Sequence, residues 1–245
     1  MSIKLVLFDL GSTLVYFQGN WDRVVSEAIE LMSREVIRMG YPVNQDRLID
    51  EYSHALRKYY IERDIDNIEY STTTLLDHTL ISQYSLALSE IELMQALDVF
   101  YEHTGNHWIL DHDAIPMLNT LKEQGYQLGL ISNASYSRDV RSQLDKNNLS
   151  TFFEQTLISA EVGFRKPHPM IFQKALKFFD VEPTQAVMVG DTLNADIIGS
   201  RRMGMKNIWI ARWASAPSTH YRDDMIVPDL TIQRLSQIPL LLKNL

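Results

Sequence analysis

Short apolar segments that alternate with helical patterns constrain the fold of this chain most strongly. Residues 3–8, IKLVLF, favour a buried strand and run directly into Asp9. Strands that alternate with helices build βαβ units, so the chain is predicted to be an α/β protein with a parallel sheet covered by helices on both faces. The other predicted strands are residues 127–131, 155–159, 186–189 and 207–211, and the predicted helices of this part are residues 114–124, 170–179 and 195–203.

Residues 16–108 have a different character, because their apolar residues recur at helical spacing. Helices are predicted over residues 20–39, from about residue 44, over residues 75–88, and from residue 89 to residue 100. The last of these opens with Ser89 followed by Glu92, which is the pattern of a capping box. We therefore expect an all-helical domain of residues 16–108, inserted into a core domain of residues 1–15 and 109–245.

Composition excludes several classes of function. The net charge of −8 argues against a nucleic-acid partner, because phosphate backbones attract basic surfaces. The absence of cysteine excludes disulfides, thiolate zinc sites and a cysteine nucleophile. No apolar run approaches the ~18 residues that a membrane span needs, and the N-terminus has no signal-peptide pattern. We expect a cytoplasmic protein with no membrane partner, and the sequence indicates no oligomeric state.

Polar side chains follow the predicted strands where each strand ends. Asp9 follows the first strand, Ser132 and Asn133 follow the strand at 127–131, and Asp191 follows the strand at 186–189. Lys166 comes after the segment at 155–159. Ligands of open parallel sheets bind at the carboxyl ends of the strands. These residues are therefore expected to lie together and to form a site.

The same residues stand in four motifs, FDLGSTL, LISNAS, RKPHP and VGDTLNADI. With these motifs the chain resembles the haloacid dehalogenase superfamily, over residues 1–15 and about 109–235. The helical insert stands where subfamily I of that superfamily carries its helical C1 cap. The resemblance implies a Rossmann-like core and a hydrolase that acts on a small phosphorylated molecule.

The resemblance also implies a role for each residue of the site. Asp9 is the nucleophile, which forms an aspartyl-phosphate, and Ser132 and Lys166 act with it. Mg²⁺ is held by the carboxylates of Asp9 and Asp191 and by the backbone carbonyl of Gly11. The residues implied in phosphate binding are Gly11, Ser12, Ser132, Asn133 and Lys166, and those implied in support are Thr13 and Asp196. Arg165, beside Lys166, is expected to point to solvent.

One residue departs from the family pattern, because Gly11 stands where the first motif usually has a second aspartate. That aspartate protonates the leaving group and then activates the attacking water, and such general acid–base catalysis is typically worth about 10²–10⁴-fold. The expected function is still a Mg²⁺-dependent phosphatase, whose substrate needs little acid help. Acyl phosphates, phosphoanhydrides and anomeric sugar phosphates are such substrates. Another group that takes over the base role would be Ser12, Tyr16, Gln18, His54 or His78.

Two alternatives remain open at this point. In the first, the chain is a dehalogenase, in which Asp191 would stand uncompensated beside Asp9, or a phosphonatase, in which a cap lysine forms a Schiff base. Lys58 is the one lysine of residues 16–108, and it does not stand at the expected early position. In the second, the chain binds phosphate or a partner without turnover.

Overall fold

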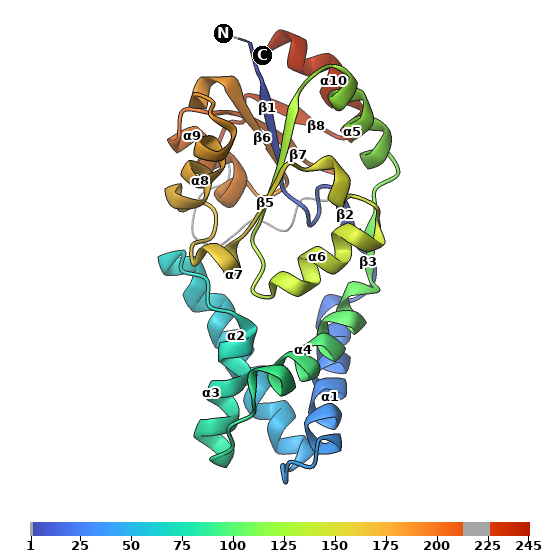
Figure 1. Ribbon diagram of the computed structural model, residues 1–245, viewed down its shortest axis with the longest axis vertical. Helices are drawn as coiled ribbons and strands as arrows, with labels where there is room; N and C mark the ends of the chain where they lie inside the picture. Colours follow the sequence, from blue (N-terminus) through green and yellow to red (C-terminus); the bar gives the residue numbers. More distant parts are fainter. Residues whose placement is uncertain (1, 213–225) are drawn as a thin grey trace.

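A six-stranded sheet forms the centre of the upper part of the molecule in the computed structural model, which describes residues 2–212 and 226–245 (Figure 1). Residues 213–225 of the predicted core therefore lie outside the described residues. All neighbouring strands are parallel, in the order β5-β4-β1-β6-β7-β8, which confirms the predicted α/β fold. The strands are β1 (Leu5–Phe8), β4 (Gln127–Ser132), β5 (Gln155–Ile158), β6 (Ala186–Gly190), β7 (Lys206–Ile210) and β8 (Leu230–Ile232).

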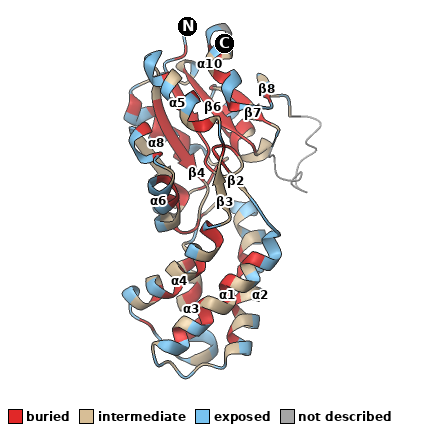
Figure 2. Cartoon of the chain, turned by 90° about the vertical axis from the view of Figure 1, so that its right-hand side faces the viewer, coloured by how far each residue is buried: buried red, intermediate tan, exposed pale blue. Residues whose placement is uncertain are grey.

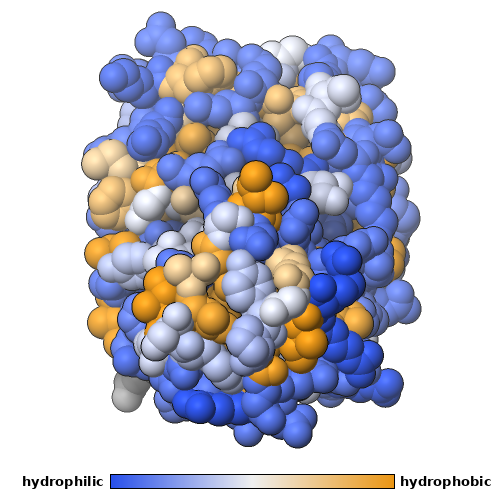
Figure 3. All heavy atoms as spheres, turned by 60° about the horizontal axis from the view of Figure 1, so that its bottom comes forward, coloured by the Kyte–Doolittle hydropathy of each residue, from blue (hydrophilic) through white to orange (hydrophobic). Residues whose placement is uncertain are grey.

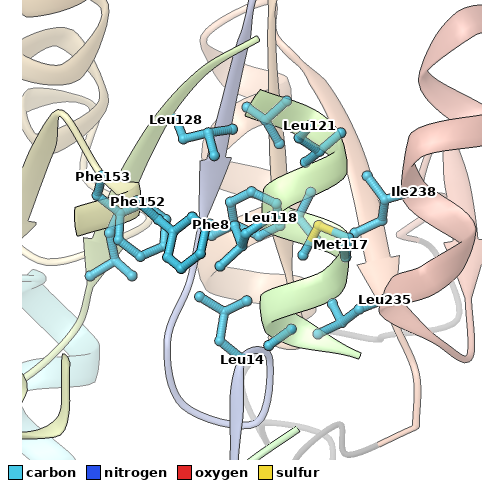
Figure 4. Close-up of a cluster of buried hydrophobic side chains, with 14 of the residues drawn as sticks. Phe8, Leu14, Met117, Leu118, Leu121, Leu128, Phe152, Phe153, Leu235 and Ile238 are labelled. Atoms are coloured by element: carbon cyan, nitrogen blue, oxygen red, sulfur yellow. The ribbon is translucent and has the colours of Figure 1, made fainter. Parts of the chain in front are cut away.

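Helices cover both faces of this sheet, and the side chains of β1 show how. Val6 and Phe8 join a core with α5, α6 and α10, whereas Leu5 and Leu7 pack with α8 on the other face. Figure 4 shows Phe8 facing Leu118 of α5 in the first of these cores. The helices of this part are α5 (Ala114–Glu123), α6 (Ser137–Lys146), α7 (Ser159–Val162), α8 (Pro169–Phe179), α9 (Ile198–Arg202) and α10 (Ile238–Leu241). They are joined by short helical turns at Ser150–Phe152, Pro183–Gln185, Leu193–Ile197, Leu235–Gln237 and Leu242–Asn244.

Four helices form the lower part of the molecule: α1 (Trp21–Arg38), α2 (Gln45–Asp66), α3 (Thr72–Tyr84) and α4 (Glu90–Gly105). Each begins after an N-cap side chain that accepts a hydrogen bond from the first turn, and at Ser89 the capping box predicted from the sequence is formed. Their buried residues make an apolar cluster of their own, while the outer faces are exposed (Figure 2). Figure 3 shows apolar and hydrophilic side chains interspersed on this end of the molecule. Among the described residues, none of the helices combines the length and the apolar character that crossing a membrane requires.

A two-stranded antiparallel ribbon connects the two parts. It consists of β2 (Val15–Phe17) and β3 (Trp108–Leu110). No strand was predicted at these positions, because strands of three residues are too short to show a period. The ribbon crosses both predicted boundaries, at 15/16 and at 108/109. The division into a core and a cap domain at those positions stays a prediction.

Candidate active site

Three adjacent strands bring the predicted site residues to one edge of the sheet. Asp9 follows β1, the central strand of the three, Ser132 ends β4 on one side, and Asp191 follows β6 on the other. The Asp9 N–H extends the pairing of β1, since it donates to the carbonyl of Val189 at 2.9 Å. All three polar residues are buried. The edge of the sheet therefore gathers them as the strand-end argument predicts.

Lys166 lies at the centre of this group. Its ammonium nitrogen is 2.6 Å from Oδ1 of Asp9 and 2.7 Å from Oδ1 of Asp196, and it donates to the Ile131 carbonyl at 2.7 Å. The side chain of Asn133 holds the backbone of Lys166 from both ends of its amide, at 2.7 and 2.9 Å. Asn133 therefore positions Lys166, which favours a role other than the phosphate contact expected from the sequence.

Three buried carboxylates share this small volume. Oxygens of Asp9, Asp191 and Asp196 lie within 4.8 Å of one another. The pKa of Asp9 is raised to about 6, because burial disfavours its charged form and the nearby Asp196 adds like charge, while the ammonium of Lys166 lowers it. Among these four residues one ammonium faces three carboxylates, so their charges do not balance.

This donor set fits a magnesium ion. Mg²⁺ binds carboxylate oxygens and backbone carbonyls and keeps positions open for water or phosphate oxygens. A divalent cation beside the three carboxylates would also offset the negative charge that Lys166 leaves uncompensated. Asp9 and Asp191 would hold the ion together with the carbonyl of Gly11, and the cation would neutralise the negative charge of a bound phosphoryl group.

The loop after Asp9 is a tight turn. The carbonyl of Leu10 accepts hydrogen bonds from the N–H groups of Thr13, Leu14 and Val15. Ser12 adopts a left-handed conformation with φ 55°, and turns of this kind can direct successive N–H groups at an anion. Thr13 is fully buried, and its hydroxyl has no hydrogen-bond partner among the described residues.

Asp196 comes from a widened helical turn, which differs from the single helix predicted over residues 195–203. In the turn at Leu193–Ile197 the N–H of Ile198 bonds to the carbonyl of Leu193, one residue further back than in an α-helix, and the α-helix α9 begins only at Ile198. Oδ2 of Asp196 accepts from the N–H of Thr192 at 3.0 Å, while Oδ1 faces Lys166. The wide turn thus orients the carboxylate that holds the lysine.

Arg165 is buried, with 8 % of its surface exposed, so the expectation that it points to solvent is wrong. Its guanidinium lies 3.7 Å from the carboxylate of Glu69, a buried residue between α2 and α3. The Glu69 carboxylate also accepts hydrogen bonds from the hydroxyls of Ser159, at 2.6 Å, and of Tyr59. Backbone hydrogen bonds from Arg165 to Asn67 and from Glu69 to the core close this contact. The segment that carries Lys166 is therefore packed against the helical part.

The remaining candidates from the sequence are scattered. His54 and His78 are exposed on α2 and α3, whereas Ser12 and Tyr16 belong to the segment that follows Asp9. Lys58, considered for Schiff-base chemistry, is an exposed residue of α2 with an ion pair to Glu62 at 3.6 Å.

Two features of the site escaped sequence reasoning: the Glu69 contact, and Trp108 of β3, whose ring lies against Gly11. Neither has a sequence signal, because each depends on which distant segment packs beside the motif.

Comparison with known proteins places this arrangement in a family. The model of the haloacid dehalogenase-like hydrolases matches residues 3–204. A protein of Pyrococcus furiosus named glyceraldehyde 3-phosphate phosphatase is 34 % identical over 212 residues, which cover 84 % of this chain and 80 % of that protein. A protein of Bacillus anthracis named pyrophosphatase PpaX is 24 % identical, over 100 % of this chain and 99 % of its own.

Among solved structures, the 2-haloacid dehalogenase of Pseudomonas syringae pv. tomato superposes with a TM-score of 0.68 and 24 % identity, over 99 % of each chain. This likeness concerns the fold alone. The family model spans most of the chain, and its match includes Asp9, Ser132, Lys166, Asp191 and Asp196. The chain belongs to the haloacid dehalogenase-like hydrolases.

Proposed function

We propose that this protein is a Mg²⁺-dependent phosphatase of small phosphorylated molecules, which acts through a phosphoryl group carried on Asp9. The observation that supports it most is the position of Lys166, 2.6 Å from the Asp9 carboxylate and 2.7 Å from that of Asp196. The relatives named as a phosphatase and a pyrophosphatase support a phosphorylated substrate.

In the proposed first step a carboxylate oxygen of Asp9 attacks phosphorus. The Asp9 O–P bond forms while the bond from phosphorus to the leaving oxygen breaks, and the electron pair departs with that oxygen. In the second step water attacks the same phosphorus while the Asp9 O–P bond breaks, its electron pair returns to the carboxylate, and the proton of the water leaves with inorganic phosphate. Two displacements replace one, and each needs negative charge to be stabilised at the phosphoryl oxygens.

The surrounding residues would supply that stabilisation. Lys166 balances the charge that gathers on Asp9 and on the phosphoryl group, and Asp196 together with the Ile131 carbonyl fixes the direction of its ammonium. Ser132 donates its hydroxyl to a phosphoryl oxygen, and the backbone N–H groups of Gly11 and Ser12 complete the anion-binding turn. Asp191 is a ligand of the magnesium ion.

The close spacing of the buried carboxylates also argues against the alternative of a dehalogenase. A site without metal would leave Asp191 and Asp9 as like charges in one buried group. The exposed ion pair of Lys58 gives no support to a Schiff-base mechanism.

The test compares wild-type protein with Asp9→Asn in the presence of Mg²⁺, and measures phosphate release from acetyl phosphate, glucose 1-phosphate and p-nitrophenyl phosphate. We expect turnover by the wild type and a loss of at least about 10³-fold in Asp9→Asn, because the nucleophile is removed. Asp46→Asn is the matched control, since Asp46 is an exposed residue in the first turn of α2. Equal turnover by wild type and Asp9→Asn would exclude the proposed mechanism, and turnover by neither would favour a binding protein.

A further inference from the structure

Position 11 has little room for a side chain, whereas its backbone conformation does not require glycine. The left-handed glycines among the described residues are Gly19, Gly40, Gly125, Gly163 and Gly204. Gly11 is not one of them, so its backbone would accept an ordinary L-residue. The neighbouring Ser12 takes the left-handed conformation instead. The residue at position 11 is therefore limited by the atoms that surround it.

A side chain at position 11 would meet the indole ring of Trp108. A Cβ built on Gly11 lies 3.3 Å from Cη2 and 3.6 Å from Cζ3 of that ring, where the first distance is tighter than ordinary van der Waals contact. A longer side chain keeps this tight Cβ contact, so the ring must give way slightly and the side chain is restricted to rotamers that avoid it. Gly11 and Trp108 thus share one volume, two residues from the nucleophile.

The ring of Trp108 is held in place from several sides. Trp108 pairs with Phe17 across the β2–β3 ribbon, and their rings meet edge to face with centroids 5.3 Å apart. The ring of Trp21 stands 6.4 Å away, also edge to face, and Trp108 packs against the apolar core of the sheet domain. A displacement of the indole would disturb all of these contacts.

We propose that Trp108 determines the specificity of this site, as an apolar wall against Gly11 that disfavours an acidic side chain at position 11. The inference rests on the proposed phosphatase function and names its substrate class. With a hydrocarbon edge in this place, position 11 cannot donate a proton to the leaving oxygen. The favoured substrates are phosphate compounds whose leaving group is already a stable anion: acyl phosphates, phosphoanhydrides and aryl phosphates of acidic phenols.

The chemistry of the leaving group gives the reason. When the P–O bond breaks, the leaving oxygen takes the electron pair, and an alkoxide then needs a proton in the transition state. A carboxylate, a phosphate or a nitrophenolate keeps the pair without one. The wall at Trp108 therefore does not impede these groups, whereas alkyl phosphates lose the help that an acid would give.

The first part of the test measures the contact itself, without activity, by urea unfolding. Gly11→Ala adds only a Cβ, and without a clash it should stabilise slightly by restricting the unfolded chain. The change in midpoint urea concentration should therefore be clearly less favourable in the wild-type background than in a Trp108→Ala background, where the volume is open. Phe178→Ala is the matched control, because Phe178 is an exposed aromatic residue of α8 whose ring pairs with Phe179 and does not touch position 11. Gly11→Ala should have the same effect there as in the wild type.

The second part measures turnover of p-nitrophenyl, phenyl and an alkyl phosphate. Wild type should prefer the nitrophenyl ester strongly. Gly11→Asp alone should gain nothing on the phenyl and alkyl esters, whereas Gly11→Asp with Trp108→Ala should gain about 10²-fold, the lower range for a general acid. Trp108→Leu serves as a second background, with an apolar side chain smaller than tryptophan, if Trp108→Ala does not fold.

Each outcome decides one of the two proposals. A gain by Gly11→Asp alone that equals the gain of the double variant would overturn the role of Trp108, as would an equal effect of Gly11→Ala in all three backgrounds. If the wild type hydrolyses none of the esters, nor acetyl phosphate, the phosphatase function fails and the substrate class fails with it. A wild type that is active and loses its activity in Asp9→Asn keeps the function, whatever the result at Trp108.

Discussion

Replacing Gly190 by alanine should disable the site without removing any polar group. Gly190 ends β6, and its Cα packs directly against the carboxyl group of Asp196. A Cβ there would stand 2.6 Å from the Cβ of Asp196 and closer still to its carboxyl atoms. Ordinary carbon–carbon contacts are about 3.5–4.0 Å, so Asp196 would have to retreat by about 1 Å or more.

That retreat would break the contacts that hold Lys166. Asp196 would lose its 2.7 Å ion pair with the ammonium and its 3.0 Å hydrogen bond from the N–H of Thr192. Overpacking of a buried site costs about 1–3 kcal/mol in the free energy of unfolding. Displacing a charged group by about 1 Å in a catalytic arrangement can cost about 10²-fold in rate. We expect both losses in Gly190→Ala.

Gly129→Ala separates the loss of rate from the loss of stability. Its Cβ would stand 2.7 Å from Cδ2 of Leu7 and 2.8 Å from Cε2 of Phe179, so it overpacks the same sheet against apolar side chains only. Urea unfolding should show a loss of about 1–3 kcal/mol for this variant too, while hydrolysis of p-nitrophenyl phosphate stays near the wild-type rate. If Gly190→Ala keeps full turnover, or if Gly129→Ala loses as much of it, then Gly190 does not act through Asp196.

Three further predictions concern metal, pH and the buried ion pair. Mg²⁺ should raise the Tm of the wild type, because it binds the folded state, and EDTA should reverse this increase. In Asp191→Asn the increase in Tm should be smaller. An increase as large as in the wild type would mean that the ion binds elsewhere. Burial raises the pKa of Asp139 in α6 to about 6 in the folded state, so the folded protein holds this proton more tightly than the unfolded chain. The contribution of Asp139 to stability should therefore be greatest near pH 4 and should fall as the pH rises to about 6. Asp139→Asn should remove this pH dependence and should raise the free energy of unfolding by about 1–2 kcal/mol at pH 7, measured by urea unfolding. An unchanged pH dependence in this variant would mean that another group causes it. Glu69→Ala should cost about 3 kcal/mol, because it removes the buried carboxylate beside Arg165 and leaves that buried guanidinium to the more exposed carboxylate of Asp64, 3.6 Å away. In the exposed control Glu62→Ala the loss should stay below about 1 kcal/mol, and similar losses in the two variants would contradict the argument from burial.

The parts of the fold that the sequence predicted are those with a strong local pattern. β1, β4 and β6 are buried on both faces, so each is a continuous apolar run that can be recognised without its neighbours. Helix α6 was missed because Val140 and Leu144 are almost its only apolar residues, and the rest of its surface is polar. The β2–β3 ribbon was missed because three residues show no period.

The residues of the site also divide into those that a local pattern predicted and those that depend on distant segments. Asp9, Asp191 and Ser132 were predicted because the end of a strand fixes where a side chain stands in the sheet. Arg165 was predicted wrongly because its burial depends on Glu69, a residue of the helical insert. A charged residue is normally exposed unless it is paired, and the partner here comes from a segment that no local pattern connects to it.

At Gly11, the local motif and the contact from a distant segment lead to different experiments. Read in the motif alone, the glycine is a missing acid, and Gly11→Asp is then the change that should restore it. The structure adds the ring of Trp108, which comes from the far end of the helical insert and fills the volume next to Gly11. A carboxylate at position 11 would extend from a Cβ in tight contact with an indole that two other aromatic rings hold. The informative experiment therefore changes both residues together, because the function of position 11 depends on the residue at position 108.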